Sequence, residues 1–100
     1  MLSAEFHTQS KMAPMLEELQ DQREAVAARL SKVRAILGLT KKEFAERAGL
    51  TEQVYGPFEN ARRDLSLTAA KKLRKTYSLS LEFIYFGKID DLPTRISKDL

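Results

Sequence analysis

Residues 38–60, GLTKKEFAERAGLTEQVYGPFEN, contain two short helical patterns separated by one glycine turn. The first pattern begins with a capping box, in which the Thr40 hydroxyl and the Glu43 carboxylate each accept a hydrogen bond from the other residue's backbone N–H. Gly49 ends this helix, and Thr51 is a suitable cap for the next one. The segment therefore predicts two short helices that meet at a tight turn.

Small residues on the first of these helices favour a close crossing of the pair. Ala45 and Ala48 face the turn and leave room for the second helix. This is the arrangement of a helix-turn-helix unit, whose second helix is offered to the DNA major groove. The same pattern also occurs at an ordinary corner of a helical bundle, so the rest of the chain has to decide between the two.

The remaining chain is also helical in pattern, and no stretch alternates as a strand does. Helices are expected from Pro14 to Leu37, either as one helix or as two with a break near residues 20–24, and over 81–86, with a short turn after Pro93. Residues 60–65 are expected to form a loop, and Ser66 caps another helix after it. The buried side of this helix is expected to carry Leu67, Ala70, Leu73 and Tyr77. The fold class is therefore all-α, with four or five short helices around one core.

Composition excludes several classes of function. With 100 residues, 43% of them apolar, the chain suits one domain. It has no Cys, and its only His is His7 in the N-terminal arm, so we expect no metal site, no catalytic residues and no cofactor, and hence no enzyme. No apolar run approaches the ~18 residues of a membrane span. Because the N-terminus lacks the pattern of a secretory signal, we expect a cytoplasmic protein.

The charge is concentrated in the middle of the chain. Residues 29–78 carry twelve basic and five acidic side chains, a net charge of +7. Residues 1–28 have a net charge of −3 and residues 79–100 a net charge of −1. A basic middle between acidic flanks indicates a polyanionic partner, although a solvated lysine-rich surface would give the same count.

Residues 30–87 resemble the lambda-repressor/Cro-like (XRE-type) helix-turn-helix family. The resemblance is carried by Leu30, Val33 and Arg34, by Gly38-Leu39-Thr40, by Glu43-Phe44-Ala45, by Ala48-Gly49-Leu50-Thr51, by Phe58-Glu59-Asn60, by Leu65-Ser66-Leu67, by Leu79 to Ile84 and by Gly87. It implies a compact five-helix DNA-binding domain over residues 26–87. The flanks would be an arm and helical extension, residues 1–25, and a tail, residues 88–100.

The resemblance also implies roles for single residues. Arg34 and Glu59 occupy positions that form a largely buried ion pair in the family, and a buried charge needs such a partner. Contacts to DNA phosphates are expected from helix starts and from the basic loop after the second helix of the motif. The residues in these places are Thr40, Lys41, Thr51, Asn60, Arg62 and Arg63.

The second helix of the motif departs from the family pattern. Its positions for reading DNA bases hold Glu52, Gln53, Val54, Gly56 and Pro57. Gln53 can bond adenine with two hydrogen bonds, Glu52 can accept from cytosine, and Val54 can contact a thymine methyl. Pro57 would be the sixth helical residue, where its ring clashes with a carbonyl one turn earlier. We therefore expect the helix to kink or end near Tyr55 and Gly56.

Two hypotheses for the function follow. The first is a bacterial or phage transcriptional regulator that binds double-stranded DNA specifically, as a homodimer on a pseudo-palindromic operator. The second is a protein-interaction module on the same fold, antitoxin-like or a co-regulator, with weak or absent DNA reading and an additional protein partner. Apolar rows outside the family core could form the dimer surface or could pack on their own domain. They are Leu16, Leu19, Val26, Ile96 and Leu100.

Overall fold

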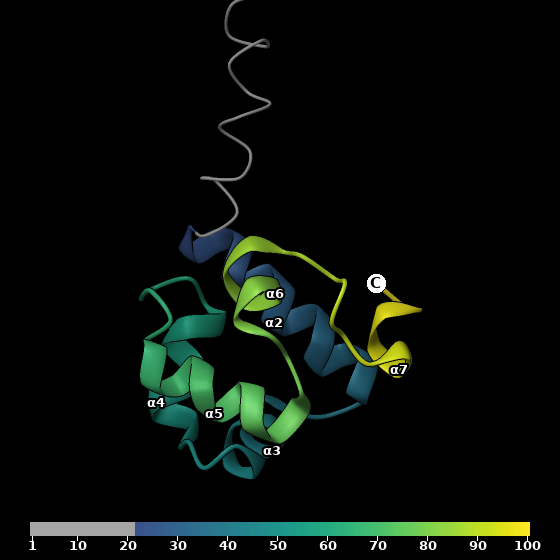
Figure 1. Ribbon diagram of the computed structural model, residues 1–100. Coiled ribbons are helices and arrows are strands. Elements are labelled where there is room, and N and C mark those ends of the chain that lie inside the picture. Colours follow the sequence, from purple (N-terminus) through teal and green to yellow (C-terminus); the bar gives the residue numbers. More distant parts are fainter. Residues whose placement is uncertain (1–21) are drawn as a thin grey trace, which may run out of the picture.

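The computed structural model describes residues 22–100, and this range contains only helices as regular structure (Figure 1). The helices are α2 (Arg23–Leu37), α3 (Lys41–Arg47), α4 (Glu52–Glu59), α5 (Leu67–Tyr77), α6 (Leu81–Phe86) and α7 (Thr94–Ser97). The expected all-α fold class is confirmed for these residues.

The long helix α2 runs through the middle of the domain. It begins at Arg23, because Gln22 before it has an extended backbone, with φ −69° and ψ 152°. It ends at Gly38, whose φ of +70° lies in the left-handed region that glycine adopts at little cost. The side of α2 that faces the core carries Val26, Ala27, Leu30 and Val33.

An aromatic cluster joins α3, α4 and α5 at the centre of the core. The rings of Phe44 and Tyr77 stack with centroids 4.4 Å apart, and the ring of Tyr55 lies 5.3 Å from that of Phe44. The Tyr77 hydroxyl donates a 2.7 Å hydrogen bond to the Phe44 carbonyl. Because the buried hydroxyl has this acceptor, the last residue of α5 is fixed against the middle of α3.

The prediction that Leu67 of α5 is buried is wrong. Leu67 leaves 51% of its surface exposed, whereas Ala69, Ala70, Leu73 and Tyr77 are buried. Ala69 belongs to the buried stripe, whose centre therefore lies about 100° around the helix from Leu67. The expected cap is confirmed, since the Ser66 hydroxyl accepts from the backbone N–H of Ala69.

The C-terminal residues pack on the same core as the motif. Leu92 and Ile96 belong to the single buried cluster, and α7 contacts α2. Val26 and Ile96 retain 3% and 0% of their exposure, so for these two residues the second of the two alternatives holds. Both pack on their own domain, while Leu100 is 40% exposed. The expectations for Leu16 and Leu19 lie outside the described residues.

Candidate nucleic-acid interface

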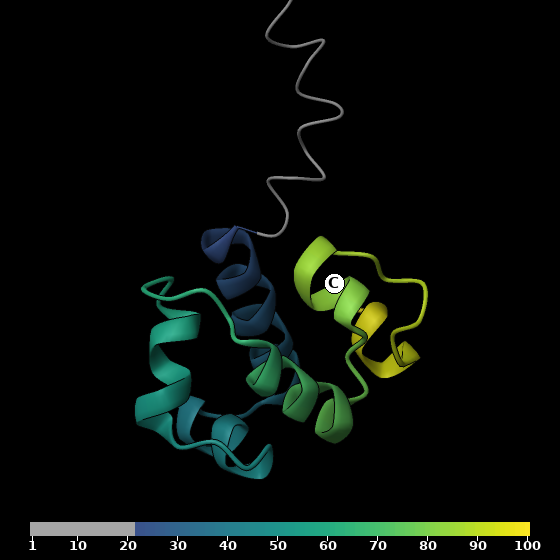
Figure 2. The ribbon, with the colours of Figure 1, turned by 60° about the vertical axis from the view of Figure 1, so that its left-hand side comes forward.

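Helices α3 and α4 meet at a turn built around Gly49. Its φ of +77° reverses the chain between the two helices, and the small side chains of Ala45 and Ala48 are buried where α3 approaches α4. Figures 1 and 2 show α4 at the edge of the molecule, with its other side against α2 and α3. The second helix of the motif therefore has an open outer face.

The start of α3 is closed by the expected capping box. The Thr40 hydroxyl accepts from the Glu43 N–H at 3.1 Å, and the Thr40 N–H donates to the Glu43 carboxylate at 2.9 Å. The hydrogen bond from the Thr40 backbone N–H is the largest cause that lowers the pKa of the Glu43 carboxyl. In α4, the Thr51 hydroxyl accepts from the N–H of Val54 at 3.2 Å. Both hydroxyl hydrogens remain available to an outside acceptor.

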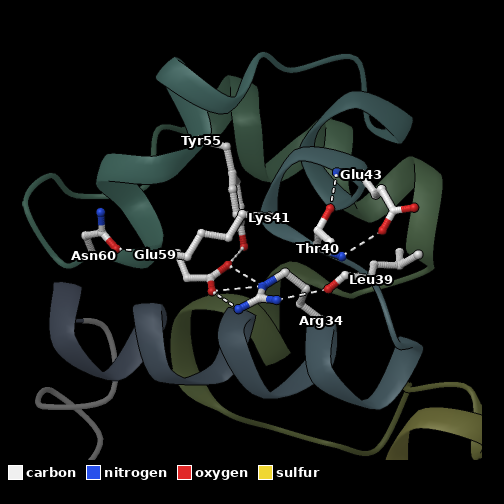
Figure 3. A network of polar contacts seen from close by, with 8 residues as sticks. All are labelled: Arg34, Leu39, Thr40, Lys41, Glu43, Tyr55, Glu59 and Asn60. Carbon is white, nitrogen blue, oxygen red and sulfur yellow. Dashed lines mark hydrogen bonds and ion pairs between the residues drawn. The ribbon is translucent and has the colours of Figure 1, made fainter.

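The inner face of α4 is held by an ionic network rather than by apolar contacts alone (Figure 3). The Arg34 guanidinium donates from Nη2 and Nε to the Glu59 carboxylate, at 2.7 Å and 2.9 Å, and from Nη1 to the Leu39 carbonyl. The Tyr55 hydroxyl donates to the other Glu59 oxygen at 2.7 Å. The network thus connects α2, the loop before α3 and both turns of α4.

Burial makes this network strong. The side chain of Glu59 is 3% exposed and that of Arg34 is 21% exposed, and every buried side-chain polar atom of the described residues has a partner. The hydrogen bond to Glu59 raises the pKa of Arg34. Burial, followed by the hydrogen bond to Glu59, raises the pKa of Tyr55. The structure thus brings together the two residues that the sequence paired, and adds Tyr55.

Of the two outcomes expected near Tyr55 and Gly56, a kink or an end of the helix, the end is wrong. The helix continues through Pro57 to Glu59. Pro57 removes only one backbone hydrogen bond, the one to the carbonyl of Gln53, and that residue lies on the exposed side of the helix. On the other side, Tyr55 and Phe58 are buried in the core. Their packing and the ion pair outweigh the cost of an interior proline.

The expected phosphate-contacting residues gather around the ends of α3 and α4. Lys41 Nζ donates to the Asn60 side chain at 2.9 Å, which brings two of them together. Arg62 and Arg63 are exposed in the loop after α4. Because a lysine ammonium has three donors, Lys41 can bond a phosphate oxygen while it holds Asn60.

The sequence reading missed what holds this loop. Arg23 donates from Nη1 to the Arg62 carbonyl at 3.0 Å and pairs through Nε with Asp64 at 3.1 Å. The Tyr85 hydroxyl donates to the Leu65 carbonyl. The sequence does contain a signal for the contacts of Arg23, because this charged residue interrupts the apolar row of its helix. The loop therefore presents Arg62 and Arg63 from a fixed backbone.

The positions expected to read bases all lie on the surface of α4. Glu52, Gln53 and Val54 are exposed, and Gly56 and Pro57 are partly exposed. The two buried residues of the helix, Tyr55 and Phe58, point the opposite way. A short helix with a fixed inner face, an open outer face and cations beside it defines a helix-turn-helix DNA-binding class.

Comparison with known families identifies this class more closely. The model of the helix-turn-helix family matches residues 30–84, more than half of the chain, and the chain belongs to that family, in its lambda-repressor-like form. The family consists of DNA-binding regulators and is not typically enzymatic. Comparisons with curated proteins and with solved structures give no match. None of the helices described over residues 22–100 is long and apolar enough to cross a membrane.

Proposed function

We propose that this chain is a sequence-specific transcriptional regulator of bacterial or phage type, which places α4 in the major groove of double-stranded DNA. The observation that carries the proposal is the geometry of α4. Tyr55, Phe58 and Glu59 fix its inner face in the core, and its outer face is open. A helix held in this way can be inserted into a groove without losing its orientation.

Contacts to the phosphates would fix the register of α4. The hydroxyl of Thr51 and the exposed N–H groups of the first turn of α4 would meet one phosphate. Lys41, Asn60 and Thr40 would contact the backbone near the start of α3, and Arg62 and Arg63 would contact it beyond the end of α4. These groups carry affinity and orientation but little sequence information.

Reading of the bases would depend on the exposed surface of α4. Gln53 can bond adenine N6 and N7, and Glu52 can accept from cytosine N4. Gly56 and Pro57 contribute no side-chain hydrogen bond, so reading by hydrogen bonds would be limited to the first turn. DNA shape would supply part of the specificity.

The proposed assembly is a homodimer on a pseudo-palindromic operator, with half-sites about one helical turn apart. In a bacterial cell the protein would work in the cytoplasm, associated with the nucleoid. No cofactor enters the proposed function, and an additional protein partner is compatible with it.

Selection of bound sequences from random DNA duplexes tests the proposal. The full chain should enrich a two-fold symmetric motif. Gln53→Ala should lose preference at one base pair per half-site and weaken binding there by about 1–3 kcal/mol. If no sequence is enriched although circular dichroism shows the chain folded, the interaction-module alternative, with weak or absent DNA reading, is favoured.

A further inference from the structure

The ends of α2, α3 and α5 border a pocket together with α7. Its volume is about 360 Å³, which lies in the range of small-molecule sites. Figures 1 and 2 both place α7 and α4 on opposite sides of the molecule, and none of the residues proposed to contact DNA lines the pocket. The pocket is therefore separate from the proposed DNA-binding surface. Its lining residues are Leu37, Leu39, Arg47, Thr76, Tyr77 and Arg95.

Part of the pocket wall is apolar. Leu37 and Leu39 are half-buried and pack against the core, and Tyr77 is only 5% exposed. The Tyr77 hydroxyl already donates to the Phe44 carbonyl, so Tyr77 offers the pocket ring surface rather than a hydrogen-bond donor. An apolar group of a ligand would be buried against these three side chains.

Two cations line the same pocket. Arg47 and Arg95 are exposed, and within residues 22–100 neither has a carboxylate at ion-pair distance. The Glu43 carboxylate, one turn before Arg47 on α3, accepts the Thr40 N–H instead. Burial raises the pKa of Tyr77, and the positive charge of Arg47 opposes this shift, so the field of Arg47 reaches the pocket wall. The two cations repel each other, and an anion between them would remove that cost.

We propose that this pocket binds a small organic anion, a carboxylate or a phosphate monoester attached to an apolar group. Arg47 and Arg95 hold the charged group, because a guanidinium forms paired hydrogen bonds with carboxylate and phosphate oxygens. The Thr76 hydroxyl is a further donor to the same group. The apolar part of the wall holds the apolar group of the ligand, which sets this site apart from one for a free inorganic ion.

A ligand in this pocket connects the C-terminal helix to the motif. Arg95 lies on α7, and Arg47 is the last residue of α3, two positions before the turn at Gly49. Binding therefore stabilises α7 against the motif without contact to the outer face of α4. The inference goes beyond the proposed function and does not depend on it.

Nuclear magnetic resonance of the full chain tests the site, because shifts of backbone amide signals locate a bound ligand. The probes are benzoate, phenyl phosphate, neutral benzamide and inorganic phosphate, all at constant ionic strength. At least one aromatic anion should shift the amide signals of Arg47, Tyr77 and Arg95, and the tighter of the two identifies the charged group. Benzamide and inorganic phosphate should bind at least about ten-fold more weakly, because each lacks one half of the interaction.

Arg47→Gln and Arg95→Gln should each weaken binding of the aromatic anion by about ten-fold, the factor for one hydrogen bond to a charged group. Arg74→Gln is the matched control, because Arg74 is an exposed arginine of α5 that does not line this pocket, and it should keep the wild-type affinity. The inference is wrong if neither aromatic anion shifts these signals, or if Arg74→Gln loses as much affinity as the other two variants. It is also wrong if benzamide or inorganic phosphate binds as tightly as the aromatic anions.

Discussion

Two charged residues, far apart in the sequence, fix how the motif is attached to the rest of the domain. Arg34 on α2 and Glu59 at the end of α4 form an ion pair in which the carboxylate side chain is only 3% exposed. A carboxylate without its partner in such a place has a large desolvation cost. The pair therefore matters more to stability than surface ion pairs do.

Removing one partner should show this cost. Arg34→Met and Glu59→Gln should each lower the free energy of unfolding by about 3 kcal/mol, since each leaves a buried polar group without its charged partner. Urea unfolding followed by circular dichroism measures the change. Asp64→Asn is the control, because it breaks the exposed pair with Arg23, whose side chains are 41% and 74% exposed, and should cost less than about 1 kcal/mol. Equal effects at the two pairs would contradict the account.

Ala61 holds the turn after α4 in a strained backbone conformation. Its φ of 58° lies in the left-handed region, where a Cβ crowds the following carbonyl. Ala61→Gly should therefore raise the free energy of unfolding by about 1 kcal/mol, measured by thermal unfolding. Ser78→Gly is a matched variant, since Ser78 has the same φ at the end of α5. A loss of stability in Ala61→Gly would show that the turn does not have this conformation.

For single helices, the sequence predicted where a helix begins better than whether it continues past a proline. The expected hydroxyl caps at Thr40, Thr51 and Ser66 are all present, because a cap depends on residues within one turn. Ser80 caps α6 in the same way. The continuity of α4 through Pro57 depends on the buried Tyr55 and on Glu59, whose partners lie on other helices. The helix propensity of proline describes only neighbouring residues in the sequence, so it could not include the stabilisation that these contacts with other helices provide.

Pro57 should nevertheless cost stability within α4. Pro57→Ala restores the N–H that can bond the Gln53 carbonyl, and should raise the free energy of unfolding by about 2 kcal/mol. This value is the cost of a proline inside a helix, reduced because alanine makes the unfolded chain more flexible. We expect the same variant to change which DNA sites are bound, since it alters the outer face of α4. Urea unfolding and selection from random duplexes measure the two effects. A variant less stable than wild type would mean that the ring of Pro57 is needed inside the fold.

For the whole molecule, the family pattern predicted the class of fold but not the extent of the core. The match covers residues 30–84, yet Leu92 and Ile96 beyond it, and Val26 before it, are part of the same buried cluster. An apolar row in a single sequence does not show whether it faces its own domain or a partner. The places of Lys41, Arg62 and Arg63 follow from helix ends and one loop and could be predicted from the sequence, whereas the contacts of Arg23 with that loop needed the tertiary structure. The role of these cations in binding DNA stays a prediction.

In the proposed function, the basic ends of the motif meet DNA phosphates. Titration of the full chain with genomic DNA fragments at several salt concentrations tests this contact. We expect that affinity falls steeply with salt, and that Arg62→Ala with Arg63→Ala weakens binding to all sequences alike and reduces the salt slope by up to about one per lost phosphate contact. The control, Lys71→Ala with Lys75→Ala on the exposed side of α5, removes the same charge and should leave the slope unchanged. If binding is absent, or does not depend on salt, the basic ends of the motif do not contact DNA phosphates.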